Sequence, residues 1–241
     1  MDSAAAAFRW TELDRTRWPE FRDRLLRAPM GGPAAVSRTY PGYPTWTLPR
    51  TAPRLWCSLD RQLQRRRSAR QLGPCWPSRS TLARWLHGSH SAQPGAGHGP
   101  VPSAGGLQAL ELYLVNWTED WLPAGGYHFD RAAGHLSQVV EGAARTDWQK
   151  RVPSLELLTG GCGLAVIVGD APRVLERYGP RGARFLLLEA GHLMQNLALL
   201  ATSLAMTLCP LGGFFEQEVA TTLRLPSTDW VLYLAAIGSG R

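Results

Sequence analysis

The sequence predicts an α+β protein, with the α/β class as the alternative, and two features of its hydrophobic pattern carry this prediction. The first is a set of short apolar runs that are rich in β-forming residues and bounded by turn residues, as strands are. These runs cover residues 110–117, 126–130, 164–168 and 230–237. The second is a long apolar stretch between the last two runs, residues 183–207, whose length favours a helix.

The chain begins with segments that differ from this pattern. Residues 8–28 predict two short amphipathic helices separated by Pro19. Residues 30–53 are dense in Gly, Pro, Ser and Thr, which cannot sustain a helix, so we expect an extended strap across a surface. We therefore divide the chain into an N-terminal unit, residues 1–54, and a main domain, residues 55–241.

The main domain is predicted to open with two helices and a long loop. Residues 59–67 predict a basic helix that ends near Arg70. Ser80 is placed to cap a helix over residues 81–87. Residues 88–106 are almost all small or polar, and a loop this long in a compact domain is commonly functional or disordered.

The later elements are predicted to form the core. The run at residues 164–168 is continuously apolar and is bounded by Gly163 and Gly169, which is typical of a strand buried on both faces. The helix over residues 183–207 begins after an Arg-rich turn, and a final strand closes the chain.

Several classes of protein are excluded. Asp2 stands where a secretory signal would be basic, and the apolar run after it is too short for one. The apolar stretch over residues 185–211 is interrupted by charged and polar residues, so we expect a buried helix and no membrane span. The four cysteines are scattered without CxxC spacing, which argues against a metal site and a disulfide framework. We expect a cytoplasmic protein.

Positive charge is concentrated in the first half of the chain. The net charge is +7, and Lys150 is the one lysine among 26 basic residues. Residues 1–100 hold 16 arginines against six acids, whereas the remaining residues hold ten bases against 13 acids. Because the arginine fork matches phosphate oxygens, a phosphate-bearing ligand is an expected partner. Nucleic acid is not, since the chain carries no nucleic-acid recognition motif.

Three segments are candidates for ligand contact. Residues 65–70 supply two guanidinium groups and a hydroxyl at alternate positions, which suits a phosphate, although a solvated basic face is the alternative. Residues 102–106 are small, so their backbone can approach a flat or anionic ligand, although an ordinary glycine turn would look the same. Residues 211–214, after the long helix, have the same character.

The long helix also carries a polar stripe. Glu189, His192, Gln195 and Asn196 are spaced by three, three and one residues, which places them on nearly one face. Polar groups on a buried helix must find partners. Structural hydrogen bonding is the favoured interpretation for Glu189 and His192, and ligand contact is the alternative. The sequence contains no P-loop, nucleophile elbow or HExxH motif.

Taken together, these motifs resemble a known family. An RRSAR segment, PSAGG before the strand LELYLV, GGYHFD, then EAGHLMQN and LGGF are similar to the nitroreductase-fold FMN oxidoreductases. Within that family the chain most resembles the SagB type, the azoline dehydrogenases of ribosomal peptide maturation. The resemblance extends over residues 8–237 and implies a three-layer α/β/α fold with a central mixed sheet, a long buried helix and a homodimer with FMN at its interface.

The resemblance assigns roles to matching positions. Arg66, Ser68 and Arg70 match the residues that hold the FMN phosphate and the polar edge of the flavin. The remaining cofactor contacts match the loop along the flavin, the buried helix and the loop at the reactive face. These residues are Pro102, Ser103, Ala104, Gly105, Gln195, Gly212 and Gly213.

The chain departs from the family at two places. Arg177-Tyr178 stands where azoline dehydrogenases often carry Lys-Tyr, and arginine stays protonated, so it cannot act as a base. Tyr178 is therefore the expected acid–base residue, with Arg177 either favouring its phenolate or positioning substrate. The family's tyrosine after the PSAG loop is also absent, because Gln108 follows Leu107 there.

The resemblance implies an FMN-dependent dehydrogenase that converts a thiazoline or oxazoline, in a peptide or carrier-bound substrate, to the azole, with oxygen reoxidising the flavin. A cyclase of the same biosynthesis is an expected partner. Two alternatives remain open: an NAD(P)H-dependent nitro or quinone reductase, and a non-catalytic family member that scaffolds a biosynthetic complex.

Overall fold

The computed structural model describes residues 19–20, 22–23, 37–49, 58–91 and 99–239. Of the helices predicted over residues 8–28, only the four described positions can be assessed, and these are helical. The rest of that prediction lies outside the described residues.

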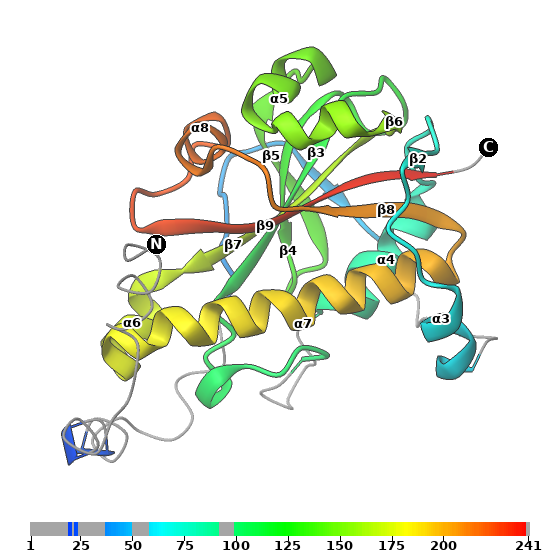
Figure 1. Ribbon diagram of the computed structural model, residues 1–241. Coiled ribbons are helices and arrows are strands. Elements are labelled where there is room, and N and C mark those ends of the chain that lie inside the picture. The colour runs from blue at the N-terminus through cyan, green and yellow to red at the C-terminus, as the bar shows by residue number, and fades with distance from the viewer. Residues whose placement is uncertain (1–18, 21, 24–36, 50–57, 92–98, 240–241) are drawn as a thin grey trace.

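A seven-stranded sheet forms the centre of the fold (Figure 1), in the order β1-β5-β4-β3-β7-β9-β8. Its strands are β1 (Thr45–Thr47), β3 (Leu110–Asn116), β4 (Gly125–Asp130), β5 (His135–Glu141), β7 (Gly163–Asp170), β8 (Met206–Leu211) and β9 (Asp229–Ser239). Every neighbouring pair in it is antiparallel.

The expected mixed sheet is therefore wrong for the central sheet. The short connections within β3-β4-β5 force neighbouring strands to run in opposite directions, because a parallel pair needs a long crossover. The parallel pairing in the described part of the chain lies in a separate ribbon, formed by β2 (Gln71–Leu72) and β6 (Thr159–Gly160).

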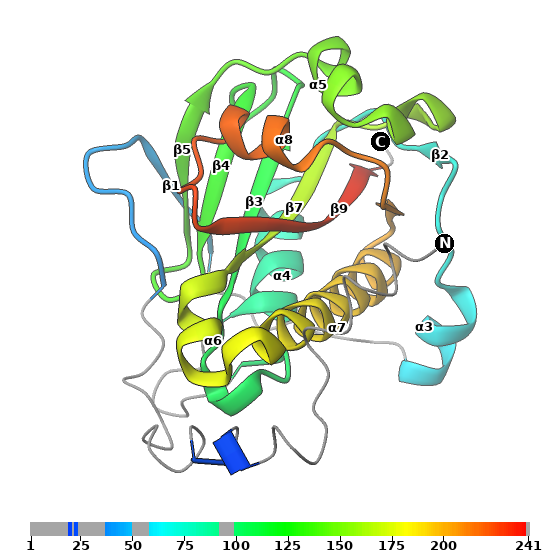
Figure 2. The same ribbon diagram turned by 60° about the vertical axis from the view of Figure 1, so that its left-hand side comes forward.

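Helices cover both faces of the sheet (Figure 2), which confirms the three layers. One face packs against α4 (Arg79–His90), α6 (Ala171–Tyr178) and α7 (Gly182–Ser203), and the other against α5 (Arg145–Arg151), η2 (Pro153–Leu157) and α8 (Glu216–Thr222). Alternation along β3 divides the two cores: Leu112 and Leu114 face α7, and Tyr113 and Val115 face the opposite layer. The remaining short helices are α3 (Leu59–Arg65), η1 (Ala104–Gly106) and η3 (Gly179–Arg181).

The long helix α7 is buried along one face only, so the expectation of a buried helix holds for half of it. Leu186, Leu193 and Leu197 lie at helical spacing in the core, whereas Leu187 and Leu188 are 47% and 56% exposed. The helical stretch Ala171–Ser203 is long and apolar enough for a membrane span by length and composition alone, but its inner face packs on the sheet as a core helix does.

Several helix boundaries differ from the sequence prediction. The long helix ends at Ser203 rather than residue 207, because Ala205 adopts a left-handed backbone (φ 55°) and the chain turns into β8. Helix α3 ends before the predicted residue 67. Helix α4 is capped by Ser78 instead of Ser80, since the Ser78 hydroxyl accepts a hydrogen bond from the Thr81 amide (3.2 Å).

Residues 37–49 of the predicted strap are described, and they consist of extended backbone interrupted by a turn at residues 41–43, where the Tyr43 amide donates to the Tyr40 carbonyl (3.3 Å). Its strand β1 pairs with β5 and forms one edge of the central sheet. Upstream, Arg38 donates hydrogen bonds to the Asp229 carboxylate and to the Tyr113 hydroxyl (3.1 Å to the latter), and the Tyr40 and Tyr113 hydroxyls lie 2.6 Å apart. The strap thus adds an edge to the sheet of the main domain, and the division at residue 54 stays a prediction.

Candidate active site

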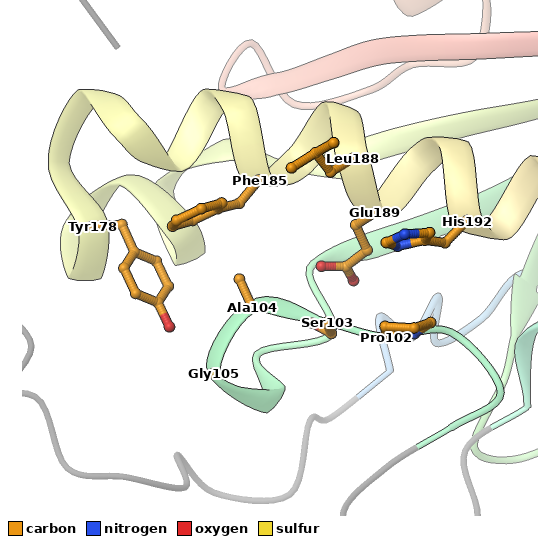
Figure 3. A pocket seen from close by; sticks show the side chains of 9 residues that line it. All are labelled: Pro102, Ser103, Ala104, Gly105, Tyr178, Phe185, Leu188, Glu189 and His192. Atoms are coloured by element: carbon orange, nitrogen blue, oxygen red, sulfur yellow. The ribbon is translucent and has the colours of Figure 1, made fainter. Parts of the chain in front are cut away.

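A pocket of about 430 Å³ lies between the N-terminal half of α7 and the loop that contains η1 (Figure 3). Its lining combines apolar side chains with a carboxyl, an imidazole and a phenol. The lining residues are Pro102, Ser103, Ala104, Gly105, Tyr178, Phe185, Leu188, Glu189 and His192. A mostly apolar cavity with a few convergent polar groups is the usual form of a small-molecule site.

The structure brings the predicted acid–base pair onto the predicted flavin loop. Arg177 and Tyr178, both nearly buried, end α6 and lie against Gly105. A Cβ atom at Gly105 would lie 2.3 Å from the Tyr178 hydroxyl oxygen and 3.2 Å from the Arg177 guanidinium carbon. The backbone of Gly105 is also left-handed (φ +59°), so both the backbone conformation and the lack of room for a side chain require glycine. Phe185 of α7 meets the Tyr178 ring edge-on, with centroids 5.0 Å apart.

A second titratable group faces the same pocket from α7. The Glu189 side chain is buried, and its carboxyl accepts hydrogen bonds from the Ser103 hydroxyl and from the backbones of Ala104 and Ala109. Burial raises the pKa of Glu189 to about 7, and these hydrogen bonds and the Arg131 charge oppose the rise only in part.

The arginine cluster, Arg66, Ser68 and Arg70, lies elsewhere on the chain. It follows α3 and runs beside β8, where the Ala69 amide donates to the Leu208 carbonyl (3.0 Å). Ser68 and Arg70 are exposed and Arg66 is half-buried. Within the described part of the chain, no hydrogen bond or ion pair engages the Arg66 and Arg70 guanidinium groups, so their donors are available to an anion such as a phosphate.

The glycine loop after β8 is held in place from the opposite layer. The Gly213 carbonyl accepts hydrogen bonds from the Ser154 hydroxyl (2.6 Å) and the Ser154 amide (3.3 Å). Gly212 is exposed, and a Cβ atom there would meet nothing within 4 Å. The loop is therefore fixed at Gly213 and open at Gly212, and its contact with a flat ligand stays a prediction.

The predicted cofactor residues fall into two groups within one chain. The pocket contains Pro102, Ser103, Ala104 and Gly105, but neither the arginine cluster nor the glycine loop. Figures 1 and 2 place α3, which leads into the arginine cluster, beside the end of α7 that continues into β8, whereas the pocket lies toward the end next to α6.

Gln195 lies in α7 as predicted, but its side chain is exposed. It shares the outer face of the helix with Leu188 and His192, because residues four and seven apart lie on one side of a helix. The predicted contact of Gln195 with the cofactor stays a prediction.

Sequence reasoning missed part of the pocket. Glu189 bonds to the neighbouring loop, which is the favoured interpretation from the sequence, and both Glu189 and His192 also line the cavity. Phe185 and Leu188 were not singled out. The polar stripe of α7 was the available signal. It could not reveal which loop packs against that stripe, because residues 102–106 lie far earlier in the chain.

The central antiparallel sheet, the long helix and the glycine-lined loops define a class of α+β oxidoreductases. Residues 63–239 match the Nitroreductase family, and the chain belongs to this family. Nitroreductase family proteins commonly bind FMN. The family predicted from the motifs is therefore confirmed.

Two relatives show how far the similarity extends in sequence. A nitroreductase-like protein of Methanocaldococcus jannaschii is 24% identical over 180 residues, which cover 75% of this chain and 90% of the relative. The microcin B17-processing protein McbC of Escherichia coli is 30% identical over 144 residues, which cover 56% of this chain and 52% of McbC. The match thus spans about half of McbC.

Solved structures share the fold. A nitroreductase-like protein of Anabaena variabilis superposes with a TM-score of 0.73 at 23% identity, over 86% of this chain and 44% of that one. A chain of the E. coli microcin synthetase McbBCD complex with truncated pro-MccB17 bound has a TM-score of 0.64 at 21% identity, over 100% and 98%. An oxidoreductase containing FMN has a TM-score of 0.53 at 17% identity, over 77% and 79%.

Proposed function

We propose that this protein is an FMN-dependent dehydrogenase that oxidises a thiazoline or oxazoline to the azole in peptide natural-product biosynthesis. The observation that carries the proposal is the Arg177–Tyr178 pair, which lies nearly buried against Gly105, with Tyr178 lining a pocket of about 430 Å³. The similarity to McbC, a microcin B17-processing protein, supports the substrate class.

The residues present fit FMN. The arginine cluster offers two guanidinium groups and a hydroxyl to the phosphate, and Gly106 and Gly212 leave open space where a Cβ would stand. The loop residues 102–105, together with Gln195, Gly212 and Gly213, would contact the ring. When bound, FMN supplies an acceptor for the hydride, a proton with two electrons, that leaves the β-carbon of the azoline.

The protein's own residues manage the proton. Tyr178 takes the proton from the α-carbon of the azoline ring, so that loss of a proton and a hydride leaves one new C=C bond and an aromatic ring. Arg177 stays protonated, and its guanidinium carbon lies 5.5 Å from the Tyr178 ring centroid, so it places a fixed positive charge beside the acid–base residue. Phe185 and Leu188 form an apolar wall of the pocket.

A homodimer explains the separation of the two groups of cofactor residues. The outer face of α7 exposes Leu187 and Leu188, and apolar residues on a helix surface favour a protein contact. A two-fold related copy packed on this face would bring the arginine cluster of one chain toward the pocket of the other. The structural likeness to a chain of the McbBCD complex supports a cyclase of the same biosynthesis as a further partner. The cytoplasmic location stays a prediction.

The test begins with the visible spectrum of the purified protein. A yellow protein is mixed without oxygen with a synthetic peptide that carries one thiazoline. We expect bleaching of the flavin and loss of two hydrogens from the peptide by mass spectrometry. Bleaching by NAD(P)H without azoline oxidation would instead identify a nitro or quinone reductase. A colourless protein that takes up no added FMN would refute both enzyme assignments and favour the scaffolding alternative.

Variants test the assignment of the residues. Tyr178→Phe should retain flavin and lose turnover, because it removes the acid–base hydroxyl and keeps the ring. Arg66→Ala and Arg70→Ala should lose flavin. Arg65→Ala is the matched control, since Arg65 is exposed on the adjoining helix end and lies outside the assigned cluster.

A further inference from the structure

We propose that Glu189 is a positioning residue for the acid–base site: its carboxyl anchors residues 103–109 and thereby holds Gly105 against Tyr178. The assignment of Tyr178 as the acid–base group rests on the proposed function. The anchoring of the loop by Glu189 does not, because it depends only on contacts within the chain.

The hydrogen bonds to Glu189 arrive from both ends of the loop. The Ser103 hydroxyl and the backbones of Ala104 and Ala109 all bond to its carboxyl. Ser103 in turn accepts a hydrogen bond from the Gln108 amide at its side-chain oxygen (2.7 Å). The carboxyl therefore ties the start of the loop to its end, and Figure 3 shows it directed from α7 toward the loop.

The loop so tied is the one that meets the acid–base pair. Gly105 lies in the turn between the anchored residues, with a left-handed backbone and with the Tyr178 hydroxyl and Arg177 guanidinium packed against it. A shift of this turn would change the room left for the Tyr178 hydroxyl. Glu189 thus acts on Tyr178 through the loop and not by direct contact.

Burial makes the charged form of the Glu189 carboxyl energetically unfavourable. Only 4% of Glu189 is exposed, and burial raises its pKa to about 7 despite the hydrogen bonds that favour the carboxylate. A residue kept only for stability would not hold a group whose charged form burial disfavours. Such groups concentrate at functional sites, where position matters more than stability.

Other charged groups lie around Glu189 and its loop. Asp170 donates its amide to the Ala109 carbonyl (2.8 Å) and pairs with Arg173 (3.1 Å), whose guanidinium reaches the Gln108 carbonyl (3.5 Å). Arg131, from the turn after β4, lowers the pKa of Glu189 by its charge and donates a hydrogen bond to the Gln108 carbonyl (2.9 Å). Arg177 and Tyr178 face the pocket site from α6, and His192 lines the pocket from α7. Glu189 is the one acidic residue among those that line the pocket in the described chain. His192 lines the same pocket, so the experiments must distinguish the effect of Glu189 from that of His192.

The anchor should weaken when Glu189 is protonated. A carboxylate accepts at all its lone pairs, whereas a protonated carboxyl gives up one acceptor position to its own proton. The loop is therefore held firmly above neutral pH and loosely below it. Turnover should fall as the pH drops through about 7, because Tyr178 loses its fixed neighbour.

The first experiment measures amide hydrogen exchange in the flavin-free protein, corrected for intrinsic rates, in wild type, Glu189→Gln and His192→Gln. The Gln side chain keeps the size of Glu but turns NH₂ donors toward the backbone donors. We expect wild-type protection at Ala104 and Ala109 to fall about tenfold or more below neutral pH, as for a lost charged hydrogen bond. Protection should be low at every pH in Glu189→Gln and unchanged in His192→Gln. Equal protection in Glu189→Gln and wild type would overturn the proposal.

The second experiment compares the pH profiles of kcat and KM in the flavin-loaded proteins. Glu189→Gln should lower kcat with little change in KM or flavin content and should remove the limb near neutral pH, which His192→Gln retains. A limb that survives in Glu189→Gln would refute the role in catalysis. If wild type binds flavin and oxidises no azoline, the proposed function fails, and the exchange experiment still decides whether Glu189 anchors the loop.

Discussion

Replacing Gly105 by alanine tests the geometry of the site most directly, because Gly106 beside it provides a matched control. Both glycines have left-handed backbones, with φ of +59° and +68°. A Cβ atom at Gly106 meets nothing within 4 Å, whereas one at Gly105 lies 2.3 Å from the Tyr178 hydroxyl oxygen. The two variants thus share the backbone cost and differ in the contact with Tyr178.

The magnitudes follow from these distances. An alanine forced to positive φ costs about 1 kcal/mol, so Gly106→Ala should lower the unfolding free energy by that amount and the Tm by about 2–4 °C. In Gly105→Ala the Tyr178 hydroxyl must retreat from 2.3 Å to an ordinary contact of 3.4 Å or more, a movement of 3.4 − 2.3 = 1.1 Å. The tip of a side chain moves at small further cost, but a misplacement of about 1 Å at a catalytic group lowers turnover about 100-fold.

The assay combines denaturant unfolding, flavin content and single-turnover azoline oxidation. Gly106→Ala should keep its flavin and its turnover, and Gly105→Ala should keep its flavin and lose turnover. In a Tyr178→Phe background the hydroxyl is absent, so the two glycine variants should unfold at equal denaturant concentration. Equal turnover of Gly105→Ala and Gly106→Ala in the wild-type background would refute the placement of Tyr178 against the loop.

Three further outcomes are expected. Arg66→Ala and Arg70→Ala should each weaken FMN binding about 10–100-fold, the effect of losing a charged hydrogen bond of about 1.5–3 kcal/mol, as measured by fluorescence titration of the apoprotein. Because the pKa of Glu189 is raised from 4.5 to about 7, the folded protein binds more protons than the unfolded chain over that range. The wild type should lose up to about 3 kcal/mol of stability as the pH rises from 4.5 to 7, and Glu189→Gln should not; a matching loss in the variant would contradict the burial of this charge. Leu187→Glu should convert a dimer to a monomer in sedimentation analysis, whereas Leu157→Glu, on the opposite layer, should not; a dimer that survives Leu187→Glu would exclude α7 as its interface.

The sequence predicted the elements whose signals are local. The strands over residues 110–117, 126–130, 164–168 and 230–237 all occur, within one or two residues at each end. Strand β8 was missed because its apolar residues continue the pattern of the helix before it, and only the turn at Ala205 separates them. Strand β5 was missed because its sequence, HLSQVVE, mixes polar residues with its apolar ones and gives a weaker strand pattern.

The candidate site also contains some features that local sequence indicated and others that depend on how the elements pack. Motif resemblance indicated the arginine cluster and the two glycine loops, since these depend on residues that are neighbours in the chain. The antiparallel course of the central sheet and the exposure of Gln195 depend on how elements pack. The mixed sheet implied by the family resemblance was therefore wrong, and no local pattern indicated that the Gln195 side chain is exposed.

The sequence by itself therefore determined the family and four of the strands of the central sheet, and it supplied the prediction of the arginine cluster as a phosphate site. Only the tertiary structure decided which of those residues meet. It places Tyr178 and Arg177 against Gly105 and brings the Glu189 carboxyl to the same loop. It sets the arginine cluster apart from this pocket. The physical reason is that these contacts join segments far apart in the chain, and packing against α7, not local propensity, fixes their positions.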